Sequence, residues 1–152
     1  MILLGLLSPL CWVLASLCNA VMDTLADRTH FEQSIFSKYN AEFWLKTDSW
    51  DNKYIDIDGD SEGDVEGGLK HKGVFGFLNN LSDGWHIFQS MMIIFLAFSV
   101  ILFQFTINIF IFDNLFLNIS MWAILLGALW NGPFNVTYNK LLKKNKNKLK
   151  NA

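Results

Sequence analysis

Three long runs of this sequence contain no charged side chain. They cover residues 1–22, 87–112 and 114–139. A membrane-spanning helix needs about 20 mostly apolar residues, because each residue rises about 1.5 Å through a hydrocarbon core about 30 Å thick. A chain of 152 residues has too small a soluble core to bury helices that are apolar on all sides. The sequence therefore predicts an all-α membrane protein with three transmembrane helices, at residues 1–22, 86–112 and 115–138.

The second and third runs are separated by little more than Asp113 and Asn114, a pair of residues typical of turns. We therefore expect the last two spans to form a helical hairpin. The third span is long enough if its helix continues past Pro133 with a kink.

The first run has two interpretations. It is either a retained span or a removable signal peptide that is cleaved near Ala20. No Lys or Arg precedes the apolar stretch, which favours the retained span because signal peptides normally begin with a positive charge. Cys11 and Cys18 lie about 10 Å apart along such a helix, too far for a disulfide.

The basic residues predict the orientation of the chain. All 12 Lys and Arg residues fall in two segments, residues 23–85 and residues 139–152. With three spans these segments lie on one side of the membrane, and the positive-inside rule makes that side cytoplasmic. The N-terminus is then outside and the C-terminus cytoplasmic. Residues 139–152 are expected to form a basic, disordered tail near anionic lipid.

Residues 23–85 are expected to contain a cytoplasmic helix that continues the first span without a break to about His30. An irregular extramembrane loop rich in aromatic and acidic residues follows it. Its aromatic residues alternate with lysines, a composition typical of residues anchored at the membrane interface. Its acidic stretch, counted from Asp56, places Ser61 and Gly67 where a calcium-binding EF-hand loop needs glycine and glutamate. We therefore interpret the stretch as a flexible, solvated loop.

Polar side chains gather where the predicted spans reach the cytoplasmic face. Histidine and carboxylate ligands are typical of zinc sites that keep a position open for water. Four residues are the candidate ligands of a divalent metal such as zinc: Asp23, His30, Asp83 and His86. Three further residues are possible supports: Asn19, Asp27 and Asn131. For this site to form, side-chain atoms of the two pairs must lie within about 5 Å of each other.

Each candidate also has a structural explanation. Asp23 and Asp27 can mark the point where the first helix leaves the bilayer. Asp83 can cap the N-terminus of the second span, and His86 can be an ordinary interfacial residue.

The third span carries small residues four positions apart, Ala123 and Gly127. Such a face lets another helix approach closely. The partner is either a helix of the same chain or a second copy, so self-association through this face is expected alongside contact with the lipid bilayer. No nucleic-acid partner is expected.

Several blocks of the sequence resemble a group of small, uncharacterised integral membrane proteins of bacteria and their phages. The blocks are N-A-V-M-D at residues 19–23, S-I-F at 34–36, S-W-D-N-K-Y at 49–54 and D-G-W-H at 83–86. The resemblance covers most of the chain and implies no activity. It implies that the Asp23/His30 and Asp83/His86 pairs act as one unit.

Three functions are compatible with these patterns. The first is a structural or interaction component of a bacterial or phage membrane. The second is a metal-dependent hydrolase at the membrane interface. The third is a holin-like pore former, which the long segment between the first two spans disfavours because a pore former has little use for it. The metal content of the purified protein separates the first two functions.

Overall fold

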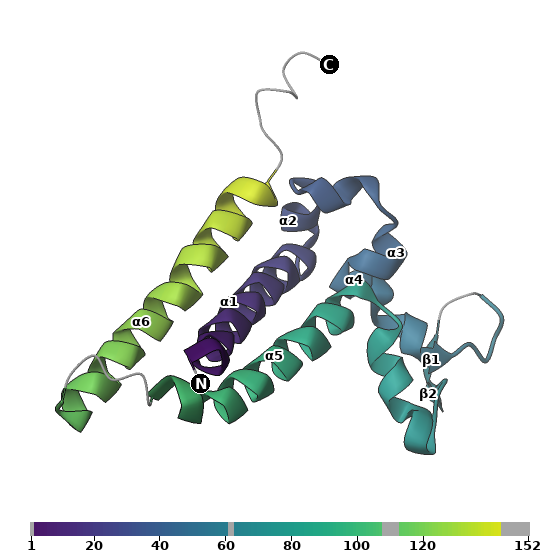
Figure 1. The fold of residues 1–152 in the computed structure, drawn as a ribbon. Coiled ribbons are helices and arrows are strands. Elements are labelled where there is room, and N and C mark those ends of the chain that lie inside the picture. The colour runs from purple at the N-terminus through teal and green to yellow at the C-terminus, as the bar shows by residue number, and fades with distance from the viewer. Residues whose placement is uncertain (1, 61–62, 108–112, 144–152) are drawn as a thin grey trace, which may run out of the picture.

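The computed structural model describes residues 2–60, 63–107 and 113–143, and most of them are helical (Figure 1). Three helices are long and apolar enough to cross a membrane. They are α1 (Ile2–Leu25), α5 (Gly84–Ile107) and α6 (Leu115–Val136). The three predicted spans are therefore confirmed as helices, and α6 does continue through Pro133. Residues 108–112 of the second predicted span lie outside the described residues.

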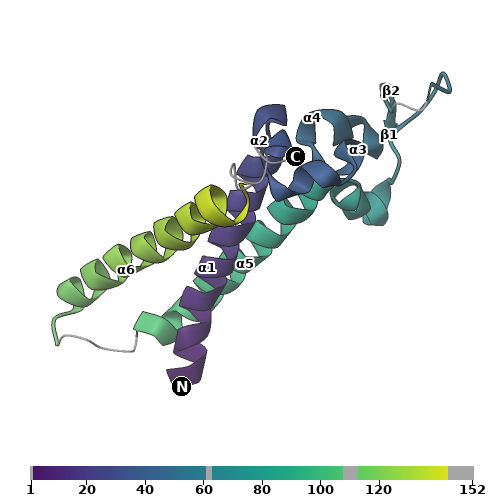
Figure 2. The same cartoon turned by 90° about the horizontal axis from the view of Figure 1, so that it is seen from above.

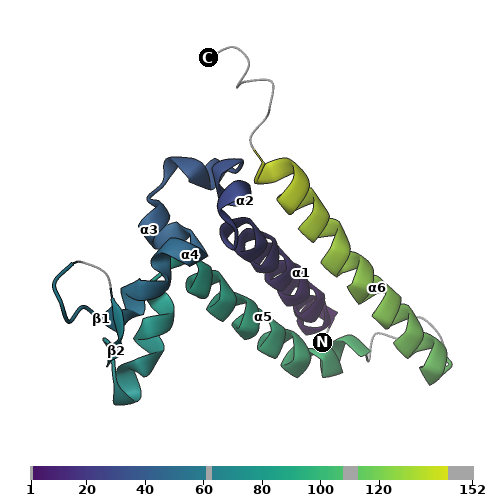
Figure 3. The ribbon, with the colours of Figure 1, turned by 180° about the vertical axis from the view of Figure 1, so that it is seen from behind.

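α1 is the central helix of the three. It lies between α5 and α6 in the views from the front, from above and from behind (Figures 1, 2 and 3). In the apolar stretch of α1 that is long enough to cross a membrane, Gly5–Leu25, 39% is buried inside the protein. The corresponding fractions are 6% for Gly84–Phe103 of α5 and 11% for Leu115–Leu141, which begins with α6. The prediction of a hairpin from the last two spans needs correction, because α5 and α6 pack mainly on α1 and touch each other little.

Small residues allow α1 to pack closely against its neighbours. Ala15, Ser16 and Ala20 are fully buried. Lipid is as apolar as a leucine side chain, so helices in a membrane associate through tight packing and interhelical hydrogen bonds rather than through the hydrophobic effect. The small side chains of α1 provide that close packing.

One interhelical hydrogen bond compensates for a proline. Pro9 lies inside α1 and has no N–H, so the carbonyl of Gly5, four residues earlier, loses its helical partner. The hydroxyl of Thr106 on α5 donates to that carbonyl at 2.7 Å. In lipid an unsatisfied carbonyl costs several kcal/mol. Thr106 therefore replaces the hydrogen bond that Pro9 cannot donate to Gly5, and it joins α1 to α5.

Further hydrogen bonds join α1 to both neighbouring helices. The Ser8 hydroxyl donates to the Ser99 carbonyl of α5 at 2.9 Å, and the Ser99 hydroxyl donates back to the Ser8 carbonyl at 3.1 Å. On the α6 side, the Trp12 indole N–H donates to the Leu126 carbonyl at 2.8 Å and the Ser16 hydroxyl donates to the Trp130 carbonyl at 2.6 Å. α1 is thus bonded to α5 and α6 at several depths.

The segment between α1 and α5 is more regular than predicted. It forms short helices: α2 (Arg28–Glu32), η1 (Ile35–Lys38), α3 (Ala41–Trp44), α4 (Lys46–Ser49), η2 (Trp50–Lys53) and η3 (Gly73–Leu81). It also contains two antiparallel strands, β1 (Tyr54–Ile55) and β2 (Asp64–Leu69), which pair Tyr54 with Leu69. The all-α prediction is therefore wrong for this segment. Side-chain caps begin several of its helices, as when the Asn40 side chain accepts from Glu42 N.

This segment is attached to the three long helices through an apolar cluster. Leu25 at the end of α1 packs with Phe31 and Leu45, and Trp44, Trp85 and Phe88 pack around them. The Trp44 ring lies directly against the backbone of Gly84, where any Cβ would collide with it. Glycine at the start of α5 therefore permits this close approach.

The end of α6 is held at the same end of the molecule. A π-helical turn, η4 (Thr137–Leu141), continues α6. Ile35 N then donates to the Leu142 carbonyl at 2.8 Å, and Ser34 pairs with Lys143 as an antiparallel bridge. Residues 139–143 of the predicted disordered tail are therefore ordered, and residues 144–152 lie outside the described residues.

Candidate functional site

The prediction that the first helix continues without a break to His30 is wrong. α1 ends at Leu25, and Asp27 adopts an extended conformation with φ −133° and ψ 137°. The Asp27 carboxylate accepts from Thr29 N at 2.8 Å and from His30 N at 3.2 Å, so it caps a new helix, α2. Asp23 and His30 consequently lie on different helices, and the argument that they share one helical face fails.

Asp83 and His86 form a close pair at the start of α5. The Asp83 carboxylate accepts from His86 N at 2.8 Å and lies 2.6 Å from His86 Nδ1. Asp83 is fully buried. The interpretation of Asp83 as the cap of the second span is confirmed, and the cap also orients the imidazole of His86.

Lys53 is a third titratable group in this region. Its side chain is mostly buried, and burial lowers its pKa while the negative charge of Asp83 raises it. A second cation, Lys46, lies 4.1 Å from the centre of the Trp85 ring. We call Lys53, Asp83 and His86 the Asp83 group. Its lysine belongs to the S-W-D-N-K-Y block and its acid to the D-G-W-H block, so the structure joins two of the sequence's distinctive blocks.

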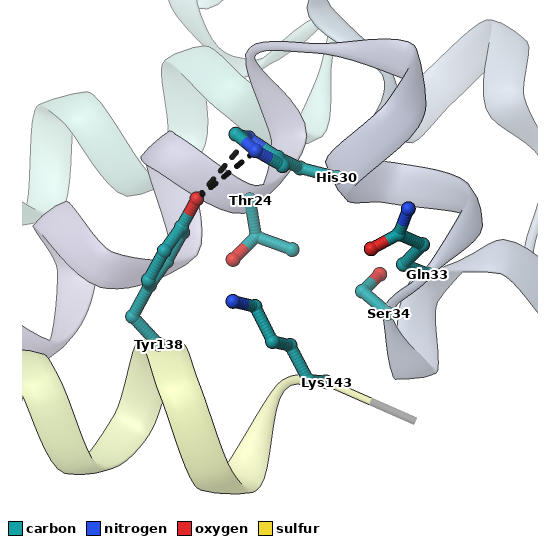
Figure 4. Close-up of a pocket in the computed structure, with 6 residues that line it drawn as sticks. All are labelled: Thr24, His30, Gln33, Ser34, Tyr138 and Lys143. Atoms are coloured by element: carbon teal, nitrogen blue, oxygen red, sulfur yellow. Dashed lines mark hydrogen bonds between the residues drawn. The ribbon is translucent and has the colours of Figure 1, made fainter. Parts of the chain in front are cut away.

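His30 has a different set of neighbours, at the end of α6. Its Nδ1 lies 3.1 Å from the hydroxyl of Tyr138, and the two rings meet edge to face (Figure 4). The pair borders a small, partly open pocket with room for about one water molecule. We call it the Tyr138 pocket. It is lined by Thr24, His30, Gln33, Ser34, Tyr138 and Lys143.

The two halves of the predicted metal site do not assemble. Among the residues that the structure describes, no three of Asp23, His30, Asp83 and His86 bring possible ligand atoms close enough to hold one ion. His30 bonds to α6, whereas Asp83 and His86 bond to each other. The unit implied by the resemblance is therefore two separate groups.

The three predicted supporting residues have other roles or none that the structure explains. Asp27 caps α2. The Asn131 amide donates to the Gly127 carbonyl of its own helix at 2.9 Å. Asn19 is half-buried on α1, and the structure gives no role to its side chain in either group.

Three other carboxylates lie near one another, in the acidic stretch that we interpreted as flexible. Ligand atoms of Asp56, Asp58 and Asp64 lie within 4.8 Å of one another. Ile57 N donates to Asp64 at 2.8 Å and Gly59 N donates to Asp56 at 2.6 Å. These carboxylates therefore already stabilise the turn between β1 and β2, as Asp residues commonly do in exposed turns.

The sequence patterns did not predict the residues that complete the two groups. Lys53 was counted among interfacial lysines, and Lys143 was assigned to a disordered tail. Thr24 was not singled out and Ser34 was named only as part of the S-I-F block, although both are almost fully buried. Their neutral side chains and their distance in sequence from their partners gave no local signal.

Comparison with protein-family models, with curated proteins and with solved structures gives no match for this chain.

Proposed function

We propose that the protein is a structural or interaction component of a membrane, acting through contacts with lipid and with other membrane helices. One observation carries the proposal: α5 and α6 keep large apolar side chains exposed along their length. Examples are Val100, Phe116 and Ile124, which are 71%, 76% and 70% exposed. In water such a surface would aggregate, whereas in a bilayer it is the surface that contacts lipid or another helix.

The small-residue face of α6 supports contact with another helix. Ala123 is exposed, and a Cβ added to Gly127 would meet no atom within 4 Å. The chain itself therefore does not occupy this face. A second copy of α6 is the partner we propose, because two small-residue faces allow two backbones to approach closely.

The hydrolase hypothesis has lost the geometry on which it depended, because its four candidate ligands lie in two groups. The Asp83 group has a structural explanation, because Asp83 caps α5 and its negative charge acts on the mostly buried Lys53. We therefore favour the structural role over a catalytic one.

We also propose an orientation for the protein in the membrane, with both basic segments on the cytoplasmic side. The described residues between α1 and α5 and the end of η4 lie at one end of the three helices (Figure 1). All the Lys and Arg residues are in residues 23–85 and 139–152. The positive-inside rule then places this end in the cytoplasm and the N-terminus outside. A cysteine at position 60 should react with a membrane-impermeant maleimide only after the cells are opened. Labelling in intact cells would contradict the topology.

Self-association tests the interaction role. Full-length chains carrying donor or acceptor fluorophores are reconstituted into vesicles, and energy transfer is measured as the protein is diluted with lipid. Ala123→Leu should reduce the transfer several-fold, because the larger side chain separates the helices. Ala128→Leu is the matched control, since Ala128 is also exposed on α6 but lies away from the Ala123–Gly127 face.

Two results would contradict the proposal. One is energy transfer that is equal for the wild type and Ala123→Leu at every dilution. The other is one equivalent of a divalent metal that stays with the purified protein and is lost in a Asp83→Asn variant, because that would restore the enzyme hypothesis.

A further inference from the structure

Asn131 brings a polar side chain to the outer surface of α6. The residue is exposed, whereas Asn118 on the same helix is fully buried inside the protein. α6 lies at the edge of the three long helices, with α1 on its inner side (Figures 1 and 3). The chain itself therefore leaves the amide of Asn131 uncovered.

Asn131 also lies deep in the candidate span. The carbonyl of Trp130, one residue before it, accepts from the Ser16 hydroxyl at 2.6 Å. Ser16 is close to the middle of the candidate span Gly5–Leu25. Asn131 itself lies about 15 Å before the end of the span Leu115–Leu141. This level is inside a hydrocarbon core about 30 Å thick, where no water is present to bond to an exposed amide.

Hydrogen bonds within the chain satisfy only part of the Asn131 amide. One of its N–H groups donates to the Gly127 carbonyl at 2.9 Å. An asparagine amide offers two N–H donors and one carbonyl acceptor. In the part of the chain that the structure describes, no group bonds to the second N–H or to the side-chain oxygen. One donor and one acceptor are therefore left, and unbonded polar groups are costly in apolar surroundings.

The bond to Gly127 holds the amide beside the small-residue face. Ala123, Gly127 and Asn131 follow one another at intervals of four residues, so they form one ridge on α6. A Cβ added to Gly127 would meet no atom within 4 Å. Helices that pack through such ridges cross so that neighbouring residues of the ridge stay in contact. A helix that packs on Ala123 and Gly127 therefore reaches the amide of Asn131.

The unbonded groups of Asn131 are complementary to those of an identical residue. Each copy has one donor and one acceptor left, so two copies satisfy each other completely. Two copies of one chain insert in the same orientation, and a two-fold axis along the membrane normal brings each residue of the contact close to its own counterpart. A helix without a polar side chain at this level would leave both groups unbonded. Hydrogen-bond complementarity therefore favours a second copy of α6.

We propose that the Asn131 residues of two copies bond to each other through two reciprocal amide hydrogen bonds, which fix the register of a parallel α6 pair. The second N–H of each amide donates to the side-chain oxygen of the other. This inference rests on the proposed self-association through Ala123 and Gly127, and it names the groups that make the pairing specific. A lipid chain does not replace the second copy, because its methylene groups neither donate nor accept hydrogen bonds.

The test uses full-length chains with donor or acceptor fluorophores, reconstituted into phosphatidylcholine vesicles and diluted with lipid. Asn131→Leu keeps a side chain of similar size and removes the amide. It should need about tenfold more protein per lipid for half-maximal energy transfer, because two hydrogen bonds of the strength found between membrane helices are lost. Asn131→Gln keeps the amide and should retain most of the pairing.

Asn135→Leu is the matched control. Asn135 is also exposed on α6, and its amide also donates to a carbonyl of its own helix, that of Asn131, at 2.8 Å. It lies one turn closer to the end of the span, where headgroups and water can bond to its amide. The same substitution should therefore change the protein density for half-maximal transfer less than twofold. Circular dichroism of each variant shows whether a loss of transfer arises from a loss of helix.

The outcomes separate this inference from the proposed function. If Ala123→Leu lowers the transfer but Asn131→Leu matches the wild type, the copies associate without the amide and this inference alone is overturned. If the wild type shows no transfer at any density, self-association is absent and both proposals are wrong. Equal losses for Asn131→Leu and Asn135→Leu would also overturn the inference, because the amide in the hydrocarbon core would then have no special role.

Discussion

α1 and α6 are both long and apolar enough to cross a membrane, yet they occupy different places in the fold. The mean hydropathies of their candidate spans are similar, 1.7 for α1 and 1.4 for α6. The buried fractions differ, however, because 39% of the α1 span is buried and only 11% of the α6 span. α1 has small residues and hydroxyls on the sides that face its neighbours, whereas α6 presents large apolar side chains outward. The difference teaches that hydropathy indicates which segments are spans, while small residues and hydrogen-bonding groups decide which span is central.

The same substitution on the two helices gives the strongest test of this comparison. Ala15 on α1 is fully buried, and Ala123 on α6 is exposed. Ala15→Leu should destabilise the protein by about 1–3 kcal/mol, because extra methylenes do not fit a tightly packed interface. Ala123→Leu should change stability by less than about 0.5 kcal/mol, as expected for a surface position.

Unfolding of the micelle-bound protein by increasing SDS measures both variants. Equal destabilisation by Ala15→Leu and Ala123→Leu would mean that α6 is packed as tightly as α1. The distinction between a central helix and an outer helix would then be wrong.

A smaller effect is expected at the proline of α1. Thr106→Val removes the hydroxyl that donates to the Gly5 carbonyl and keeps the shape of the side chain. We expect a loss of about 0.5–2 kcal/mol, the range found for single interhelical hydrogen bonds in membranes. Thr106→Ser keeps a hydroxyl and should lose less. If the two variants unfold at the same SDS concentration, the hydroxyl does not stabilise the contact between α1 and α5.

The smallest effect concerns the point where α1 ends. The backbone N–H groups of His30 and Thr29, which donate to Asp27, lower the pKa of this exposed carboxyl. Because the folded-state pKa is depressed, the cap contributes its full stability above the ordinary aspartate pKa, and that contribution is lost as the pH falls through the lowered value.

An NMR titration of the Asp27 carboxyl should therefore give a midpoint below the ordinary value of about 3.9. Asp27→Asn keeps an acceptor for the cap and should remove this pH dependence, whereas Asp27→Ala should loosen α2 at every pH. A midpoint at or above the ordinary value would indicate that Asp27 does not cap α2. A continuous helix from α1 to His30 would then be possible again.

Local patterns predicted the features that depend on neighbouring residues. The three spans follow from uncharged runs, because helix formation satisfies every backbone group within one segment. The contact between Asp83 and His86 follows from their spacing of three residues at the start of a helix. The break after Leu25 was missed, although Asp27 followed by a helix is a local capping signal, because the spacing of Asp23, Asp27 and His30 also matched one continuous helix.

The sequence by itself determined that this chain has three membrane-length helices and that its charges lie at their ends. Only the tertiary structure decided that α1 is central, that His30 meets Tyr138 and that Lys143 faces a pocket. The physical reason is the distance along the chain: Ser8 and Ser99 are 91 residues apart, and His30 and Tyr138 are 108 apart. Hydropathy and helical spacing describe a segment and its immediate neighbours, whereas hydrogen bonds over such separations exist only after the helices have packed.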